Sequence, residues 1–369
     1  MAEGSRYGVN YPTLVNLDGH LAVARSRCES RMVARLFLFT SFNNMKKTIL
    51  LMVAALFFTM QVTAQTQFAT LVHEGTFSSF TGADALSEAM AAAADGDVIT
   101  LSSGTFNGCT ISKAITLRGA GMEADEQGRQ TIIQTKNMGI SVNDGEEKSV
   151  NIEGIYMPSI TLSVNKNLGS IYLNKCAIGT FMSKSKADIM VEQAVITNCK
   201  INELSNQYQS SIYSNQKYSE ISLYNTYVIN TNAANSSFYN CAIGNSSDGL
   251  FYNCIFLKDA ATKANTTDHC VIPVALEGGT HTNNYVVEDV TTLFNNYDAE
   301  AIWYTRDLTL TDEAKATYLG SDGTEVGLYG GSLPFSPWLD RPIIKRLTVA
   351  PRSSKNGKLS VDIEVGETE

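Results

Sequence analysis

Through the middle of the chain, apolar and polar residues alternate over short stretches, and almost no stretch has the 3.6-residue period of an amphipathic helix. A six-residue pattern recurs there: an apolar residue, any residue, commonly Asn or Gly, then Cys, Thr or a small apolar residue, any residue, and an apolar residue. It occupies residues 117–122, 152–157, 173–178, 196–201, 223–228, 238–243 and 251–256. Short strands that recur about every 20 residues predict a solenoid, in which each coil pairs with its neighbours about 4.8 Å away.

The third and fourth positions of this pattern have distinct physical roles. Asn tolerates left-handed backbone and bonds its own chain, so the third position predicts a row of turns rather than a ligand site. The fourth position is filled by Cys176, Cys199, Cys241 and Cys254. Small apolar side chains suit a narrow dry interior, which predicts a row of buried, reduced thiols. Disulfide bonds are the alternative, because the chain outside residues 1–64 contains an even number of cysteines.

Both ends of the predicted solenoid carry signals for a different structure. Thr81 and Asp84 offer N-cap chemistry before an alanine-rich stretch, which predicts a capping helix near 83–94 that ends at Asp95 and Gly96. Four of the seven prolines follow residue 333. Two alternating runs, 343–349 and 359–365, then predict a small hairpin or C-terminal cap. The beginning of a sorting or adhesion module is the alternative.

Residues 85–121 resemble the pectin-lyase-like right-handed parallel β-helix family. The resemblance is carried by the helix, an Asp-Gly-Asp turn at 95–97, the strand 98–101, Gly-Thr-Phe at 104–106 and a strand that ends in Gly-Ala-Gly at 119–121. The segment 322–331 resembles the closing part of exported β-helix proteins of unknown function. The resemblance implies an all-β fold, a right-handed parallel β-helix with an N-terminal capping helix and a small C-terminal β extension. It implies no particular activity, because one fold hosts many functions.

A signal peptide is predicted inside the chain rather than at its start. Met45 and two lysines precede the apolar run 49–58, and Val62–Ala64 provides a small-residue cleavage site. Residues 1–44 contain five arginines and no lysine, unlike the rest, and are interpreted as a disordered extension from an early start codon. A transit peptide or cytoplasmic arm is the alternative. We therefore expect a signal peptide at 45–64, a β-helix domain at 65–333, a hairpin-like tail at 334–369, and export to the periplasm, the cell surface or the medium.

Charge and composition limit which classes of partner the sequence predicts. The formal net charge is −9, and residues 1–64 carry seven basic and three acidic side chains, so the remainder is near −13. A chain this acidic lacks the basic face needed by nucleic acid or an anionic membrane. No second apolar run is long enough to span a membrane. Without a CxxC pair or a histidine cluster, no metal site is predicted.

The catalytic candidates are few. A polysaccharide lyase on this fold is expected to hold Ca²⁺ with carboxylates and to use Lys or Arg as base. The nearest set is Lys184, Lys186, Asp188 and Glu192, for which a solvated charged loop is the alternative interpretation. The chain contains no Asp-Asp dipeptide, although glycosidases on this fold often place their carboxylates near such pairs. Asp322–Glu325 is interpreted as a tight turn, and His269 beside Cys270 has no acidic partner that the sequence alone can assign.

Aromatic side chains supply the remaining candidates. Trp303, Tyr304 and Trp338 leave the repeat region and are candidate ligand-binding residues, because Tyr and Trp rings stack on sugars. Tyrosines also gather at positions 208, 213, 218, 224, 227, 239 and 252, where stacking between coils is the favoured interpretation. The sequence therefore predicts an exported non-catalytic β-helix protein without a cofactor, which binds glycan or is adhesive or structural at the bacterial cell envelope. The alternative is a polysaccharide lyase or glycoside hydrolase that acts on acidic polysaccharide, with Ca²⁺ as cofactor if it is a lyase.

Overall fold

The structure is a computed structural model that separates the chain into two compact units, residues 1–64 and residues 65–369. It describes residues 67–134, 137–142, 145–162, 168–183, 191–205, 221–232, 236–246, 249–258 and 266–339, together with the backbone of 343–349 and 361–366. The predicted signal peptide and the segment before it lie outside the described residues.

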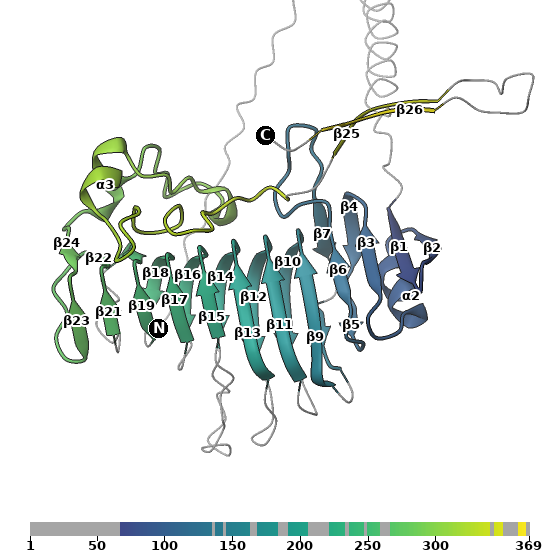
Figure 1. The fold of residues 1–369 in the computed structure, drawn as a ribbon, viewed down its shortest axis with the longest axis horizontal. Helices are drawn as coiled ribbons and strands as arrows, with labels where there is room; N and C mark the ends of the chain where they lie inside the picture. The colour runs from purple at the N-terminus through teal and green to yellow at the C-terminus, as the bar shows by residue number, and fades with distance from the viewer. Residues whose placement is uncertain are drawn as a thin grey trace, which may run out of the picture. The chain divides into compact units, whose positions relative to one another are not determined.

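Most of the second unit is built from two long sheets whose strands alternate along the chain (Figure 1). The first sheet contains β1 (Phe68–His73), β2 (Thr76–Thr81), β3 (Val98–Leu101), β6 (Thr116–Arg118), β9 (Gly145–Glu153), β11 (Leu168–Asn174), β13 (Val191–Thr197), β15 (Ile221–Tyr224), β17 (Ser236–Tyr239), β19 (Leu250–Tyr252), β21 (Thr266–Asp268) and β23 (Thr280–Thr282). The second contains β4 (Gly104–Asn107), β5 (Thr110–Ile111), β7 (Thr131–Gln134), β8 (Met138–Ile140), β10 (Tyr156–Leu162), β12 (Ala177–Ser183), β14 (Lys200–Ser205), β16 (Tyr227–Asn232), β18 (Ala242–Ser246), β20 (Ile255–Phe256), β22 (Val271–Ile272) and β24 (Tyr285–Val286).

Successive coils pair in parallel, as between β11 and β13 or between β12 and β14. The inward side chains of both sheets fill one continuous apolar core, which includes Leu173, Ile196, Ile178 and Ile201. The predicted parallel β-helix solenoid is thereby confirmed.

The N-terminal end of the solenoid is closed by a helix and a hairpin. Helix α2 (Ala85–Ala92) buries Ala85, Leu86, Ala89 and Met90 against the first coil. The predicted capping helix is confirmed, although its N-cap residue Asp84 makes no side-chain capping bond and accepts a hydrogen bond from Asn107 instead. The antiparallel hairpin β1–β2, which the sequence analysis did not predict, pairs with β3 and covers that edge of the first sheet.

At the corner where each coil passes from the first sheet to the second, one residue adopts positive φ. We call this row the turn ladder: Gly154, Lys175, Asn198, Asn225, Asn240, Asn253, His269 and Asn283. These positive φ angles confirm the predicted turns at the third position of the repeat. Asn is common there because it adopts the left-handed conformation at little energetic cost.

The next residue of each coil points into the core and forms the thiol ladder: Cys176, Cys199, Thr226, Cys241, Cys254 and Cys270. The backbone N–H of Cys176 donates to Cys199 Sγ at 3.3 Å, and that of Cys199 donates to Thr226 Oγ1 at the same distance. The five cysteines of the thiol ladder are free, and burial raises the pKa of the Cys199 and Cys254 thiols. The predicted inward row of cysteines is confirmed, with Thr226 as an equivalent member.

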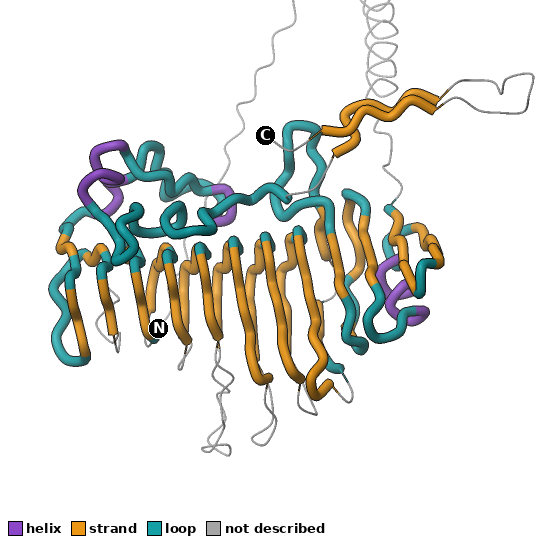
Figure 2. Tube along the Cα trace, in the orientation of Figure 1, coloured by secondary structure: helices purple, strands orange, loops and turns teal. Residues whose placement is uncertain are grey.

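After β24 the chain does not continue the coils but runs back along the second sheet, as Figures 1 and 2 show. This cover segment, residues 287–339, contains the 3₁₀-helices η2 (Val290–Leu293) and η3 (Trp303–Thr305) and helix α3 (Asp312–Thr317). Its later part meets successively earlier members of the turn ladder. Asn253 accepts from Ser321, Asn225 donates to the carbonyls of Leu328 and Gly330, and Lys175 donates to the Trp338 carbonyl.

Between the cover segment and the second sheet lies a second hydrophobic core. From the solenoid it takes Met122, Ala177, Tyr227, Ala242, Ile255, Leu257 and Val271, and from the cover segment Val290, Leu293, Phe294, Leu308, Leu310, Ala314, Val326, Leu328 and Phe335. The first outward position of the second-sheet strands, filled by Ala177, Lys200, Tyr227, Ala242 and Ile255, is therefore buried, whereas Glu203 and Asn230 farther along these strands stay exposed. Beyond the cover segment, β25 (Ile343–Val349) and β26 (Val361–Gly366) form an antiparallel hairpin, which confirms the predicted C-terminal β extension.

Candidate ligand-binding surface

The outer face of the first sheet carries one continuous row of polar and aromatic side chains. Because alternate residues of a strand point to opposite faces, the residue that follows each inward apolar position faces outward. The parallel register aligns these residues from coil to coil into the outer column: Arg118, Glu153, Asn174, Thr197, Tyr224, Tyr239, Tyr252, Asp268 and Thr282.

The centre of the outer column is a stack of three tyrosines. The ring centroids of Tyr224 and Tyr239 lie 5.0 Å apart with planes inclined by 10°, and those of Tyr239 and Tyr252 lie 5.1 Å apart at 11°. The favoured interpretation of stacking between coils is confirmed for these three residues. Side chains stand roughly perpendicular to a sheet, so the phenolic hydroxyls form the outer rim of the stack. Tyr224 remains 37% exposed.

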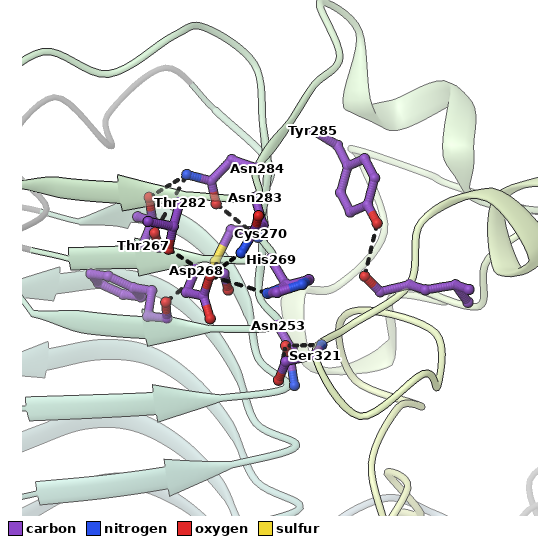
Figure 3. Close-up of polar contacts among 12 residues, drawn as sticks. Asn253, Thr267, Asp268, His269, Cys270, Thr282, Asn283, Asn284, Tyr285 and Ser321 are labelled. Carbon is purple, nitrogen blue, oxygen red and sulfur yellow. Dashed lines mark hydrogen bonds and ion pairs between the residues drawn. The ribbon is translucent and has the colours of Figure 1, made fainter.

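Beyond Tyr252 the column continues into a polar network around Asp268 (Figure 3). Asp268 Oδ1 accepts from Thr282 Oγ1 at 2.6 Å and from Asn283 Nδ2 at 3.2 Å, and it lies 3.1 Å from His269 Nδ1. Burial alone would raise the pKa of Asp268, but these three partners stabilise the carboxylate more strongly and lower the pKa below its ordinary value. The column thus carries an ionised, partly exposed carboxylate beside the tyrosine stack.

The same network shows whether Cys270 and His269 could act as a Cys–His nucleophile. His269 belongs to the turn ladder and meets Asp268, the acidic partner that the sequence alone could not assign. Cys270 instead points into the core, where its Sγ donates to the carbonyls of Phe251 and Asp268 at 3.4 Å (Figure 3). Burial raises the pKa of this thiol, so the thiolate needed for nucleophilic attack is disfavoured.

Beneath the cover segment lies a buried ion pair that the sequence analysis did not single out. Lys200 Nζ lies 2.8 Å from Glu123 Oε1, donates to the Tyr304 carbonyl, and sits 5.4 Å from the centroid of the Phe335 ring. Lys200 is only 4% exposed. An ammonium that is covered and paired with a carboxylate is poorly placed to act as a general base on a polymer.

The predicted catalytic residues are not brought together by any described contact. Lys184, Lys186 and Asp188 lie outside the described residues, and Glu192 is described only as part of the β13 backbone. The Asp322 turn is formed, since Asp322 Oδ1 accepts from the backbone and the hydroxyl of Thr324. Within the described ranges, no group of His, Cys, Asp or Glu side chains is arranged to hold a metal ion.

The predicted aromatic ligand residues belong to the cover segment. The ring centroid of Tyr304 lies 5.0 Å from that of Tyr156 in the solenoid and 5.2 Å from that of Trp303. Trp303 and Tyr304 pack against the second core, whereas Trp338 is 38% exposed. Packing therefore engages Trp303 and Tyr304, while Trp338 still presents a surface.

No helix in the described part of the chain is long and apolar enough to cross a membrane. No protein-family model, curated protein or solved structure matches this chain, so its function has to be argued from the surface itself.

Proposed function

We propose that this protein is an exported, non-catalytic β-helix protein of the bacterial cell envelope that binds glycan along the outer column. The observation that carries the proposal is the aligned row of Asn174, Thr197, the three stacked tyrosines and Asp268 on an uncovered sheet face. Its resemblance to the pectin-lyase-like family and its signal-like segment at 45–64 belong to the same proposal.

The chemistry of the row suits a polymer of sugars. Amide, hydroxyl and carboxylate groups exchange hydrogen bonds with sugar hydroxyls, and the tyrosines add apolar surface with a polar rim. The coils place these groups about 4.8 Å apart along a line, so an extended chain meets several of them at once. Many weak contacts in a row give useful affinity without a deep pocket, which suits adhesion.

Glycan-array binding by the protein, followed by titration of any polysaccharide that it retains, tests the proposal. Tyr224→Ala and Tyr239→Ala should each weaken binding at least about twofold, because an aromatic contact contributes about 0.5–1.5 kcal/mol. Phe77→Ala is the matched control, since Phe77 is 72% exposed on β2, outside the outer column. Binding that is unchanged in both tyrosine variants would refute the outer column as the binding surface.

The enzymatic alternative has its own assay. Absorbance of the unsaturated product should stay flat on pectate, alginate and glycosaminoglycans, with or without Ca²⁺. A steady rise that Lys184→Ala or Lys186→Ala abolishes would show that the protein is a lyase.

A further inference from the structure

A recess of about 450 Å³ opens on the first sheet near its capped end. It is lined by Asp95, Gly96, Ala114, Ile115, Thr116, Lys148, Ser149 and Asn151. These residues come from the turn after α2, from the chain that leads into β6, and from β9. Ligand pockets in proteins have volumes of about 300–1,000 Å³, so the recess is large enough for a single sugar unit.

The recess contains a fixed pair of opposite charges. Asp95 Oδ2 accepts from Lys148 Nζ at 2.9 Å, and Asp95 Oδ1 accepts from the backbone N–H of Ala114 at 2.8 Å. The side chains of Asp95 and Lys148 are 41% and 38% exposed, so both still face solvent. The hydrogen bond from Lys148, followed by that from Ala114, lowers the pKa of Asp95 and keeps it ionised at neutral pH.

Asn151 and Thr116 add polar groups to the lining of the recess, and Tyr172 lies on the next coil. Asn151 Nδ2 lies 3.4 Å from Thr116 Oγ1, and these two outward residues are in register across β6 and β9. On the next coil, Tyr172 is in register with Asn151 and is 39% exposed. A carboxylate, an ammonium and an amide therefore line one opening, and Tyr172 stands on the coil beside it.

We infer that this recess binds one neutral hexose unit of a glycan, with Asp95 accepting a hydrogen bond from one hydroxyl and Lys148 donating to the adjacent hydroxyl. A ring that carries neighbouring hydroxyls can bridge an acceptor and a donor 2.9 Å apart. Tyr172 offers an apolar surface beside the opening. The inference rests on the proposed glycan-binding function and adds a distinct subsite and a sugar class to it.

Charge distinguishes neutral from acidic sugars. The carboxylate of a uronic acid would meet the ionised carboxylate of Asp95 on a chain of net charge −9. These two like charges repel, and the positive charge of Lys148 is already compensated by Asp95. A neutral hydroxyl pair meets no such repulsion and uses both charged groups.

Methyl NMR of the full chain gives a local readout, because Ile115 and Ala114 line the recess. The probes are the methyl glycosides of glucose, galactose and mannose, with methyl glucuronide as the acidic comparison. At least one neutral glycoside should shift the Ile115 methyl signal in a saturable way. Asp95→Asn and Lys148→Gln should each weaken that binding about tenfold or more, since hydrogen bonds to charged groups are the strong ones.

Lys315→Gln is the matched control, because it removes the exposed partner of Asp312 far from the recess in the sequence. It should leave the sugar titration unchanged. No saturable shift with any neutral glycoside, or a shift with the glucuronide alone, would overturn the inference. Polysaccharide binding that is unchanged in Tyr224→Ala and Tyr239→Ala, while a neutral glycoside still shifts the Ile115 signal, would count against the outer column and not against the recess.

Discussion

On the outer face of the first sheet, Asn174, Thr197 and Tyr224 stay in contact with solvent, whereas the equivalent column of the second sheet is buried beneath the cover segment. Tyr224 and Tyr227 show the contrast at close range. Tyr224 is 37% exposed and stacks on Tyr239, while Tyr227, three positions later, is 1% exposed and accepts a hydrogen bond from Arg306. The same residue type therefore builds a surface on one sheet and a core on the other.

This difference separates residues that hold the fold from residues that are available to a ligand. The cover segment packs against Lys200, Tyr227 and Tyr156, so the charged and aromatic side chains beneath it are structural. The first sheet leaves its side chains open. Substitutions on the covered face should change the free energy of unfolding, and those on the open face should change binding.

The largest effect is expected at the covered ion pair. Lys200→Ala leaves the Glu123 carboxylate without its cation in a buried site, which typically destabilises a fold by about 3–5 kcal/mol. Urea unfolding should show a lower midpoint with a similar slope. Lys315→Ala, which removes one partner of an exposed pair 4.0 Å apart, should leave the midpoint unchanged. A Lys200→Ala protein as stable as the parent would show that the cover segment does not bury this pair in solution.

A smaller effect is expected where the cover segment folds tightly on itself. A Cβ at Gly330 would lie 1.7 Å from the Glu325 carbonyl oxygen, so Gly330→Ala forces that turn apart. Overpacking of this kind costs about 1–3 kcal/mol and should expose residues 287–339 to limited proteolysis. Leu333→Ala, at a position that is 62% exposed in the same segment, serves as the control, and the protease should cleave it no faster than the parent.

The thiol ladder lies in the core between the two sheets, so substitutions there probe the interior that both sheets share. Cys199→Thr should be tolerated, because Thr226 already fills an equivalent slot and its hydroxyl accepts from the backbone N–H of Cys199 on the preceding coil. Cys199→Ala removes the acceptor of the Cys176 N–H and should cost about 1–3 kcal/mol in urea unfolding. Equal stability of the two variants would mean that the acceptor for the Cys176 N–H does not contribute measurably to stability. Denatured, unreduced residues 65–369 should show at least the five free thiols of the ladder.

The smallest effects concern two carboxylates with opposite pKa shifts. Burial raises the pKa of Glu325 above 4.5, so its ionised form opposes folding at neutral pH, and stability returns as pH falls through the raised pKa. Burial is outweighed at Asp268, whose lowered pKa stabilises the fold above pH 3.8 and whose contribution is lost as pH falls through that lowered pKa.

Glu325→Gln should therefore stabilise the protein at pH 7 and Asp268→Asn should destabilise it, each by less than about 1 kcal/mol. Urea unfolding at pH 7 and at pH 4 measures both. The Glu325→Gln gain should shrink at pH 4, where the parent carboxyl is protonated. A gain that is the same at both pH values would contradict the role of the Glu325 charge.

Much of the repeat architecture could be predicted because its determinants are local. Alternation of apolar and polar residues, as in Ile171–Asn174, sets which side chains point inward. At the corners, Asn198 and Asn253 adopt left-handed backbone, a preference that belongs to the single residue. The helix that begins at Ala85 and the hairpin strand that begins at Ile343 were likewise readable from short segments.

The candidate site depended on the tertiary structure. Alternation is the same in both sheets, so no local pattern shows that residues 287–339 cover the first outward residues of the second-sheet strands and leave the outer column of the first sheet open. Lys200 meets Glu123, and Lys148 meets Asp95, only because stacking of coils brings distant residues to the same corner. By itself the sequence determined the coil, its corners and its interior, since these depend on the preferences of single residues. Which face became surface was decided by the packing of segments far apart in the chain.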